Sequence, residues 1–331
     1  FLGADLTSLA LALQLPGAGG RTLSGILFRP SVHYQQLGSG AARLSERVRD
    51  LRKRLLYPLM LRHRALTRLH SLDPYFPAFA RSAYPYGAKV TVLPDPVATV
   101  EPPKPADLEP LCQVPPGRTT FVLFGVLTER KGVMALLKAL ALLDDATAER
   151  TAVIMAGQLD AAIRDAALQQ FATLARKRPA LSLHLEDRHL STGQLTRLVC
   201  QADIVLAPYQ RFVGSSGVLI WAARIGRPVL TQTYGLLGHL VREYRLGLAV
   251  DCNEPLQLAD AMRRMTAHHA DRLADAAGQA AFLAGRTPED FACSVIGMTT
   301  IASQNRHNQA PETADSSGPR NDHNPSRHEH V

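Results

Sequence analysis

Residues 202–229 read ADIVLAPYQRFVGSSGVLIWAARIGRPV, and this stretch decides the fold. It begins with an apolar strand that ends at Pro208, and residues 226–228 lead into the next strand. Between the strands, a glycine- and serine-rich turn at residues 214–217 opens a helix that is apolar on all sides, which is typical of a buried helix. The order strand, turn, helix, strand predicts part of a parallel α/β sheet.

The turn at residues 214–217 suits a phosphate group. Glycine lets a backbone approach a ligand closely, and the hydroxyl groups of Ser215 and Ser216 can add hydrogen bonds. The N–H groups of a helix that starts at Gly217 point outward and carry a partial positive charge. The turn is therefore a candidate anion site.

A second anion site is predicted at residues 121–133, which read FVLFGVLTERKGV. A buried strand runs into Gly125, a short loop follows, and a helix begins near Gly132. Arg130 can grip two phosphate oxygens and Lys131 supplies a point charge, so a diphosphate is the natural ligand. From this segment alone, an ordinary strand–turn–helix with two solvated cations explains the residues equally well. Both loops follow strand carboxyl ends, however, where ligands of open α/β sheets bind.

Strands and helices continue to alternate outward from these segments, and they predict a complete doubly wound domain over residues 118–286. The predicted strands are 120–124, 152–156, 181–185, 204–207, 228–231 and 247–250. The predicted helices are 133–143, 161–177, 192–200, 217–225, 236–244 and 255–268. A last helix is expected at 287–301, and the polar residues 302–331 are expected to be disordered.

Residues 1–97 predict a second, incomplete domain of the same α/β class. A helix at 5–15 precedes three strands at 23–28, 66–70 and 89–93, fewer than a sheet of this type usually has. We therefore expect that the chain lacks the first part of this domain. The proline-rich residues 98–117 are predicted to be a linker.

Basic residues crowd between Arg43 and Arg68, and they predict one long helix, kinked at Pro58. Its apolar side is formed by residues at helical spacing, namely Leu44, Val48, Leu51, Leu55 and Leu59. The run is either a solvated polar face or a patch that meets anionic lipid or a phosphate-bearing acceptor. Nucleic acid is a poor partner, because aromatic residues do not interleave with the basic run.

Composition supports a globular protein. The chain has 331 residues, of which 46% are apolar, and a formal charge of +8. No stretch reaches the roughly 20 apolar residues of a membrane span, and no secretory signal is present. The four cysteines are too scattered for a zinc site or a disulfide framework. These features predict a cytoplasmic protein without a metal, either in solution or peripheral at the inner face of the membrane.

Four pieces in fixed order then resemble a known family. They are the Gly125-to-Val133 loop followed by Leu-Leu-Ala-Leu-type helix residues, the Ala-Asp-Ile-Val-Leu-Ala-Pro strand, the Gly-Arg-Pro-Val turn, and Leu-Gly-Leu-Ala-Val with its following helix. Together they resemble the donor domain of GT-B glycosyltransferases, especially the retaining class called group one or family four. The resemblance covers residues 119–265, and residues 93–97 resemble the hinge strand of the same class.

The resemblance implies two Rossmann-like domains and transfer of a sugar from a nucleotide sugar to a glycan or lipid-linked acceptor, as in polysaccharide synthesis. Lys131 matches the lysine that contacts the donor diphosphate, and Ser216 and Gly217 match the helix start that faces the same phosphates. Cations and helix dipoles then stabilise the leaving nucleotide, so neither a divalent metal nor a cofactor is expected.

The sequence also departs from the family. Val126 stands where an arginine usually follows the first glycine, and Arg130 is a candidate substitute. The two usual glutamates, one for the sugar and one for the ribose, fall near Val213 and at Trp221. Neither side chain can accept a hydrogen bond from a ribose hydroxyl. Donor recognition has therefore either changed or been lost.

The remaining site candidates follow other strands. Glu186, Asp187 and Arg188 stand where this class holds the nucleotide base, although polar loop residues are common there. His33 and Asp73 follow strands of the first domain and are candidates to contact acceptor or sugar, or else ordinary loop and capping residues.

Three hypotheses remain at this point. The first is a retaining glycosyltransferase, and the second is a non-catalytic or truncated GT-B relative that binds nucleotide sugar without transfer. The third is a GT-B epimerase or phosphorylase, for which no converging cluster of carboxylates and histidine is evident.

Overall fold

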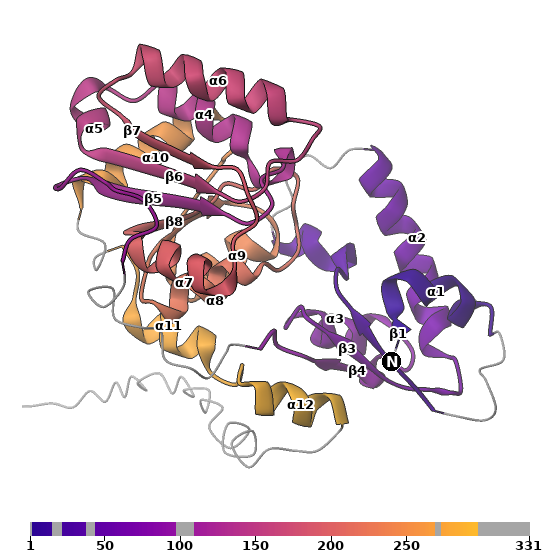
Figure 1. Ribbon diagram of the computed structural model, residues 1–331. Coiled ribbons are helices and arrows are strands. Elements are labelled where there is room, and N and C mark those ends of the chain that lie inside the picture. Colours follow the sequence, from indigo (N-terminus) through magenta and orange to yellow (C-terminus); the bar gives the residue numbers. More distant parts are fainter. Residues whose placement is uncertain (1, 15–21, 38–43, 97–108, 269–272, 297–331) are drawn as a thin grey trace, which may run out of the picture.

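The structure is a computed structural model, and it describes residues 2–14, 22–37, 44–96, 109–268 and 273–296. Figure 1 shows two α/β lobes, with the N-terminal lobe in indigo to purple and the C-terminal lobe in magenta to orange. Each lobe is built on its own parallel sheet. The predicted tail at residues 302–331 lies outside the described residues.

The C-terminal lobe is a doubly wound domain around a six-stranded parallel sheet. Its strands are β5 (Thr119–Phe124), β6 (Thr151–Ala156), β7 (Ser182–Glu186), β8 (Ile204–Ala207), β9 (Val229–Gln232) and β10 (Gly247–Val250). Its helices are α4 (Val133–Ala141), α5 (Asp145–Glu149), α6 (Arg164–Lys177), α7 (Thr192–Gln201), α8 (Gly217–Arg224), α9 (Gly235–Glu243), α10 (Pro255–Ala267) and α11 (Ala276–Leu283). The predicted strands are confirmed to within one residue at each end.

The strand order places a crevice beside the centre of this sheet. The order is β10-β9-β8-β5-β6-β7, so the chain runs from β5 to one edge and then returns to β8 on the other side of β5. In doubly wound sheets, ligands bind at the carboxyl ends of the two strands where the order reverses. Here those strands are β5 and β8, and the two loops predicted to bind anions follow them.

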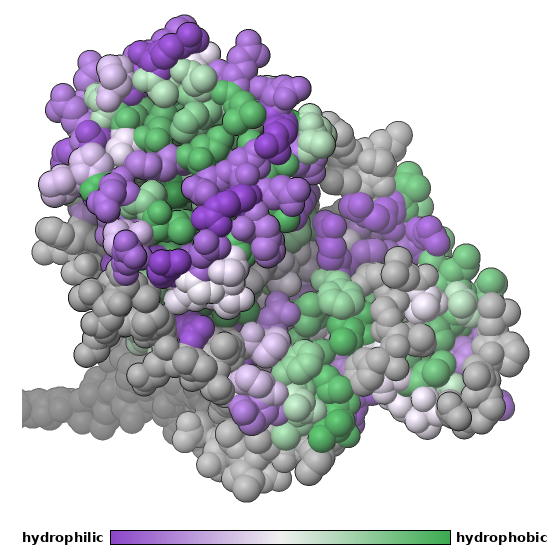
Figure 2. Space-filling view, in the orientation of Figure 1, coloured by the Kyte–Doolittle hydropathy of each residue, from purple (hydrophilic) through white to green (hydrophobic). Residues whose placement is uncertain are grey.

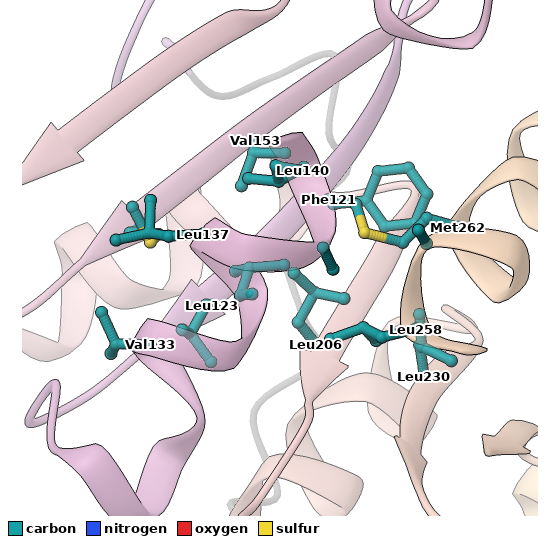
Figure 3. Packing of buried hydrophobic residues seen from close by; sticks show 14 of the residues in the cluster. Phe121, Leu123, Val133, Leu137, Leu140, Val153, Leu206, Leu230, Leu258 and Met262 are labelled. Carbon is teal, nitrogen blue, oxygen red and sulfur yellow. The ribbon is translucent and has the colours of Figure 1, made fainter. Parts of the chain in front are cut away.

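Both faces of the sheet are buried, which holds these loops on a rigid base. Along β5, Phe121 and Leu123 face α4, α6 and α10, while Val122 and Phe124 face α7, α8 and α9. Figure 3 shows Phe121 and Leu123 packed among Leu137, Leu206 and Met262. Full burial contributes roughly 1.5–3 kcal/mol for each side chain of this kind.

The N-terminal lobe holds a smaller sheet of order β1-β2-β3-β4. Its elements are β1 (Leu2–Gly3), α1 (Ala4–Ala12), β2 (Leu23–Leu27), the 3-10 helix η2 (Ser31–Leu37), α2 (Leu44–Leu61), β3 (Leu66–Ser71), α3 (Phe76–Ala83), η3 (Gly87–Lys89) and β4 (Val90–Val92). The three predicted strands are present, and β1 adds a fourth that is too short to give a sequence pattern.

The helix predicted for the basic run is shorter than expected. The helix ends at Leu61, so Arg64 and Arg68 lie outside it. The apolar stripe also faces outward, because the opposite side of the helix carries Tyr57, Met60 and Leu61, which are buried against the sheet. No helix in the described part of the chain is long and apolar enough to cross a bilayer.

The two lobes meet through η2 and α9. Tyr34 of η2 is buried in the same cluster as Leu236 and Leu237 of α9. The hydroxyl group of Tyr75, at the start of α3, donates a hydrogen bond to the Glu243 carboxylate at the end of α9. These contacts fix one side of the first lobe beside the carboxyl ends of the second sheet.

The chain returns toward the first lobe after α11. Arg286 follows this helix, and Asp95 follows β4. Partial burial raises the pKa of the Asp95 carboxyl, and the positive charge of Arg286 lowers it in part. Helix α12 (Pro288–Ile296) begins at the predicted position, and residues 297–301 lie outside the described residues. The described part of the predicted linker, residues 109–117, is not free, since Leu111, Cys112 and Val114 pack on the C-terminal lobe.

Candidate functional site

The loop after β5 brings a buried lysine back over the end of its own strand. Gly125 has a φ of 86°, a left-handed conformation, and a Cβ atom there would lie 2.7 Å from Lys131 Nζ. Lys131 is only 9% exposed, and its ammonium group donates a hydrogen bond to the Phe124 carbonyl. The ammonium also lies 5.6 Å from the centre of the Tyr209 ring. The left-handed backbone thus favours glycine at position 125, where the flexible end of the Lys131 side chain lies close by.

Burial, and to a smaller extent the charge of the neighbouring Arg130, lower the pKa of Lys131 to about 8. Both causes disfavour the charged ammonium, and no carboxylate is among the groups that shift its pKa. An anion bound beside Lys131 would restore the proton. A negatively charged ligand at this place would therefore raise the pKa of Lys131 again.

Two further cations converge on the loop after β8. The Arg130 guanidinium lies 4.7 Å from the Phe212 ring centre, and the guanidinium of Arg29 lies 5.4 Å from the same ring. Arg29 follows β2, so it reaches this loop from the other lobe. One aromatic ring thus holds positive charge from both lobes in one place.

The two predicted anion loops are joined to each other. The Arg130 carbonyl accepts a hydrogen bond of 2.7 Å from the Gln210 N–H. Gly132 has a φ of 80°, and a Cβ atom there would lie 2.1 Å from the Pro208 carbonyl oxygen. The structure therefore brings together two loops that the sequence had placed only at the same edge of one sheet.

Helix α8 begins beside them. Ser216 caps the helix by accepting a hydrogen bond of 3.4 Å from the Val218 N–H, and its hydroxyl lies 3.0 Å from the Tyr209 hydroxyl. Around Gly217 there is open space, since a Cβ atom would meet nothing within 4 Å. Ser215 is half-buried just before the cap. The start of α8 is thus ordered and open at its first residue.

The three residues predicted for the nucleotide base have different surroundings. Asp187 accepts a hydrogen bond of 2.8 Å from the Leu159 N–H and pairs with Arg164 at 2.5 Å. Glu186 and Arg188 pair with each other at the exposed end of β7. Asp187 therefore fixes the loop after β6, and Arg188 also donates a hydrogen bond of 3.1 Å to Gln194 Oε1.

Neither position that corresponds to a family glutamate offers a side-chain acceptor. Trp221 is half-buried against the cluster under α8. The Val213 carbonyl accepts a hydrogen bond of 3.0 Å from the Leu236 N–H, which ties this loop to α9. Trp221 is less enclosed than its apolar neighbours suggest, because it points toward the edge of the cluster.

His33 and Asp73 come together, although they follow different strands. His33 Nε2 lies 3.1 Å from Asp73 Oδ2, and both side chains are almost fully buried. The backbone N–H of Tyr75 donates a hydrogen bond of 2.9 Å to Asp73 Oδ1, and the His33 ring stacks on Phe79. The pair is a closed polar contact behind the lobe interface. It holds one carboxylate, where an epimerase would need several.

Three residues at the site were not predicted from the sequence. Tyr209 and Phe212 lie between the two predicted loops, and Arg29 comes from the other lobe. The first two could have been found, because they lie between the strand end at Pro208 and the turn at residues 214–217. Among the described residues, no three His, Cys, Asp or Glu side chains are grouped to hold a metal ion.

Comparisons with known proteins agree with this geometry. Residues 118–268 match the family model described as Glycosyl transferases group 1. The comparison with curated proteins returned no match.

Three solved structures illustrate the likeness in fold. Sucrose-phosphate synthase from Thermosynechococcus elongatus has a TM-score of 0.61 at 17% identity, over 92% of this chain and 72% of that one. HepE from Anabaena, solved with UDP, has a TM-score of 0.59 at 16% identity, over 89% and 79%. WaaG, a glycosyltransferase involved in lipopolysaccharide biosynthesis, has a TM-score of 0.52 at 18% identity, over 86% and 78%.

The family match covers the lobe that carries both anion loops, and the solved structures cover both lobes. Residues 118–268 are therefore similar to a group 1 glycosyltransferase domain, and the chain shares the two-lobed GT-B fold of these solved structures.

Proposed function

We propose that this chain transfers a sugar from a nucleoside diphosphate sugar to a glycan or a lipid-linked acceptor. The observation that carries the proposal is the junction of the two loops after β5 and β8, which places Lys131 and Arg130 beside the start of α8. Support also comes from similar proteins, since HepE was solved with UDP and glucose. A similar trehalose-phosphate synthase is described as UDP-forming.

The diphosphate would lie between these two loops. When the glycosidic bond to the nucleotide breaks, negative charge develops on the diphosphate, and preorganised donors at that place lower the barrier. The open space at Gly217 would let the first N–H groups of α8 reach the phosphate oxygens. We infer that Lys131, Arg130 and these N–H groups replace a divalent metal in stabilising the leaving nucleotide, and that transfer proceeds with retention.

The base of the nucleotide would extend along the sheet toward the loops after β6 and β7, where Asp187 holds Leu159 in place. On the other side, Arg29 would add positive charge from the first lobe. The His33–Asp73 pair would act as a positioning contact, because it is too enclosed to touch a substrate without opening.

A second candidate function is binding of nucleotide sugar without transfer. The specific observation in its favour is that Val213 and Trp221 stand at the two places where family members carry glutamates. In this case the diphosphate site would be retained and the sugar would not be held for reaction.

One set of measurements tests both functions. UDP, GDP and ADP and their glucose conjugates would be titrated into the protein by calorimetry, and each conjugate would then be tested for transfer with and without EDTA. Lys131→Ala would be compared with Lys138→Ala, which removes an exposed lysine from the neighbouring helix α4.

We expect one nucleotide to bind, with affinity lost in Lys131→Ala and kept in Lys138→Ala. Turnover that survives EDTA and gives a product of unchanged anomeric configuration by NMR supports transfer. Binding without turnover for every donor and acceptor supports the second function, and no nucleotide binding at all overturns both.

A further inference from the structure

Arg29 adds a cation to the candidate site, and it does so from the first lobe. Its guanidinium lies 5.4 Å from the centre of the Phe212 ring, on which Arg130 also lies at 4.7 Å. The stem of the Arg29 side chain passes Gly214, since a Cβ atom on that glycine would lie 3.6 Å from Arg29 Cγ. Arg29 is therefore placed over residues 212–214, the segment that leads to the start of α8.

The backbone of Arg29 is held by its own lobe. Its carbonyl accepts a hydrogen bond from the Lys53 ammonium on α2 and another of 2.9 Å from the Ser31 N–H. Because Pro30 follows directly, the backbone of Arg29 is restricted to extended conformations. The guanidinium thus reaches the second lobe from a fixed base, as a built part of the site requires.

The diphosphate of a nucleotide sugar does not need this additional charge. Each of its phosphates carries a single negative charge, and Lys131 and Arg130 supply one positive charge each, beside the N–H groups of α8. Arg29 brings a further positive charge at the side of the site that meets the first lobe. The nucleotide base is proposed to extend the other way, toward β6 and β7. The sugar is therefore the part of the donor that would come nearest to Arg29.

The surroundings of Arg29 offer few side-chain acceptors for the hydroxyl groups of a neutral sugar. Residues 27–37 and 208–216 contain no Asp or Glu. The Gln210 side chain is already engaged, since its Nε2 donates hydrogen bonds of 3.0 and 2.8 Å to two backbone carbonyls. The Asp73 carboxylate of the first lobe is almost fully buried and already paired. Figure 2 shows hydrophilic residues, in purple, on both lobes where the region of α2 approaches the C-terminal lobe.

We propose that the donor sugar carries a carboxylate, so that the donor is a nucleoside diphosphate uronic acid, and that Arg29 binds this carboxylate. The inference rests on the proposed function, because it names the sugar that the same site would take. Stacking on a ring uses the face of a guanidinium, whereas the N–H groups in its plane form a fork that matches the two oxygens of a carboxylate. A hydroxymethyl group at the same place would offer no negative charge to Arg29.

The test compares donors that differ only at this group. UDP-glucose is paired with UDP-glucuronic acid, and GDP-mannose with GDP-mannuronic acid, while UDP and GDP alone report on the diphosphate site. Each would be titrated into the full chain by calorimetry. Arg29→Gln removes the charge, and Arg29→Lys keeps the charge without the fork. Arg81→Gln removes an exposed charge from α3 of the same lobe and is the matched control.

We expect the uronic acid of one pair to bind at least tenfold more tightly than its neutral partner. Arg29→Gln should abolish this preference and leave the affinity for UDP or GDP close to that of the unmodified chain, because Lys131 and Arg130 remain. An unchanged affinity for UDP or GDP also shows that the variant is folded. Arg29→Lys should keep part of the preference, and Arg81→Gln should keep all of it.

A comparison of two pH values identifies the cation that holds the carboxylate. A guanidinium stays protonated at pH 9, whereas burial lowers the pKa of Lys131 to about 8. The ratio of the two affinities within a pair should therefore be the same at pH 7 and pH 9, although both affinities fall. A preference that disappears at pH 9 would assign the carboxylate to Lys131 and overturn the proposal.

Three other results would also overturn it. Neutral sugars could bind as well as uronic acids, or Arg29→Gln could weaken UDP and GDP as much as the uronic acids, in which case Arg29 serves the diphosphate. Arg29→Gln could also leave every donor affinity unchanged and raise only the KM for an anionic acceptor. All of these results leave the proposed function standing, whereas the failure of every nucleotide to bind overturns both.

Discussion

Lys131 is the residue on which most of the proposed chemistry depends. It is buried beside aromatic rings and next to another cation. Its charged ammonium group therefore destabilises the folded protein unless an anion is bound beside it. A buried lysine with a lowered pKa is also a sensor of its ligand, because a bound phosphate raises the pKa again.

The affinity for UDP should therefore depend on pH. In the free protein the pKa of Lys131 is lowered to about 8, first by burial and then by Arg130. Bound diphosphate favours the charged form and raises that pKa, so affinity is full below pH 8. As the pH rises above this value, affinity should fall, by up to about tenfold per pH unit. Calorimetry between pH 6.5 and 9.5 measures the profile, and Lys131→Ala should bind at least tenfold more weakly at pH 7 with a flatter slope.

Trp221 allows a second prediction at the scale of one residue. Its ring packs half-buried on the cluster beneath α8. We expect Trp221→Glu to lower the free energy of unfolding by about 2–4 kcal/mol, because packing is lost and a carboxylate enters an apolar site. Denaturant unfolding measures this loss, and Trp221→Phe should keep most of the stability.

The opposite result for Trp221→Glu would be informative. A variant that stays fully stable and changes its choice of nucleotide would place Trp221 in a rebuilt ribose pocket. A variant that is stable and binds nucleotides unchanged would show that this residue has neither role.

At the scale of the element, the junction between η5 (Glu129–Lys131) and α4 ties the two anion loops together. Gly132 is the cap of both elements and lies directly against Pro208. Here a side chain is excluded twice, by the backbone conformation and by the neighbouring carbonyl.

Gly132→Ala should therefore destabilise the protein by roughly 2–4 kcal/mol. It should also weaken UDP binding, because the loop after β8 must move away from Arg130. Thermal and denaturant unfolding measure the first effect, and calorimetry measures the second. The matched control is Gly193→Ala in the first turn of α7, where a Cβ atom meets nothing within 4 Å, so stability should be equal or slightly higher. Equal behaviour of the two variants would contradict the assigned role of the junction.

Helices and strands could be predicted from the sequence where their burial gives a clear pattern of apolar residues. The strands of the second sheet are continuous apolar runs bounded by Gly and Pro, because both faces of that sheet are covered, and the two anion loops follow from their positions after β5 and β8. Helix α5 has only five residues and shows no such period. Helix α2 has two apolar sides, and the periodicity of leucines cannot say which of them meets the core. Contacts between the lobes, such as that of Arg29 with Phe212, cannot be predicted from local sequence patterns.

At the scale of the whole molecule, the relation between the lobes rests on a small polar cluster at the end of α9. The Tyr75 hydroxyl and His239 Nε2 both approach the Glu243 carboxylate, and the rings of Tyr75 and His239 meet edge to face at 4.7 Å. Burial raises the pKa of Tyr75 well above its usual value, and Glu243 raises it further, so this hydroxyl stays protonated as a donor.

A double-mutant cycle of Tyr75→Phe and Glu243→Gln should show a coupling free energy of about 1–2 kcal/mol. The reason is that the hydrogen bond is charge-assisted and that its donor, Tyr75, is half-buried. Unfolding by denaturant measures each corner of the cycle. Arg263→Gln with Asp260→Asn, an exposed pair within α10, serves as the control and should show little coupling. Equal coupling in the two cycles would mean that the lobes are held elsewhere.

The central position of β5 has a consequence for how the molecule is made. The Thr120 N–H donates a hydrogen bond of 2.8 Å to Asp203 Oδ2, across 83 positions in the chain. During synthesis β6 and β7 emerge before β8 and can pair on one side of β5. The other edge of β5 remains unpaired until residues 204–207 leave the ribosome. Such long-range closure is slow, and an unpaired apolar edge invites association with other chains. The junction of the loops after β5 and β8 thus forms only after β8 has been synthesised, and conditions that delay the synthesis of β8 should increase aggregation of the nascent chain.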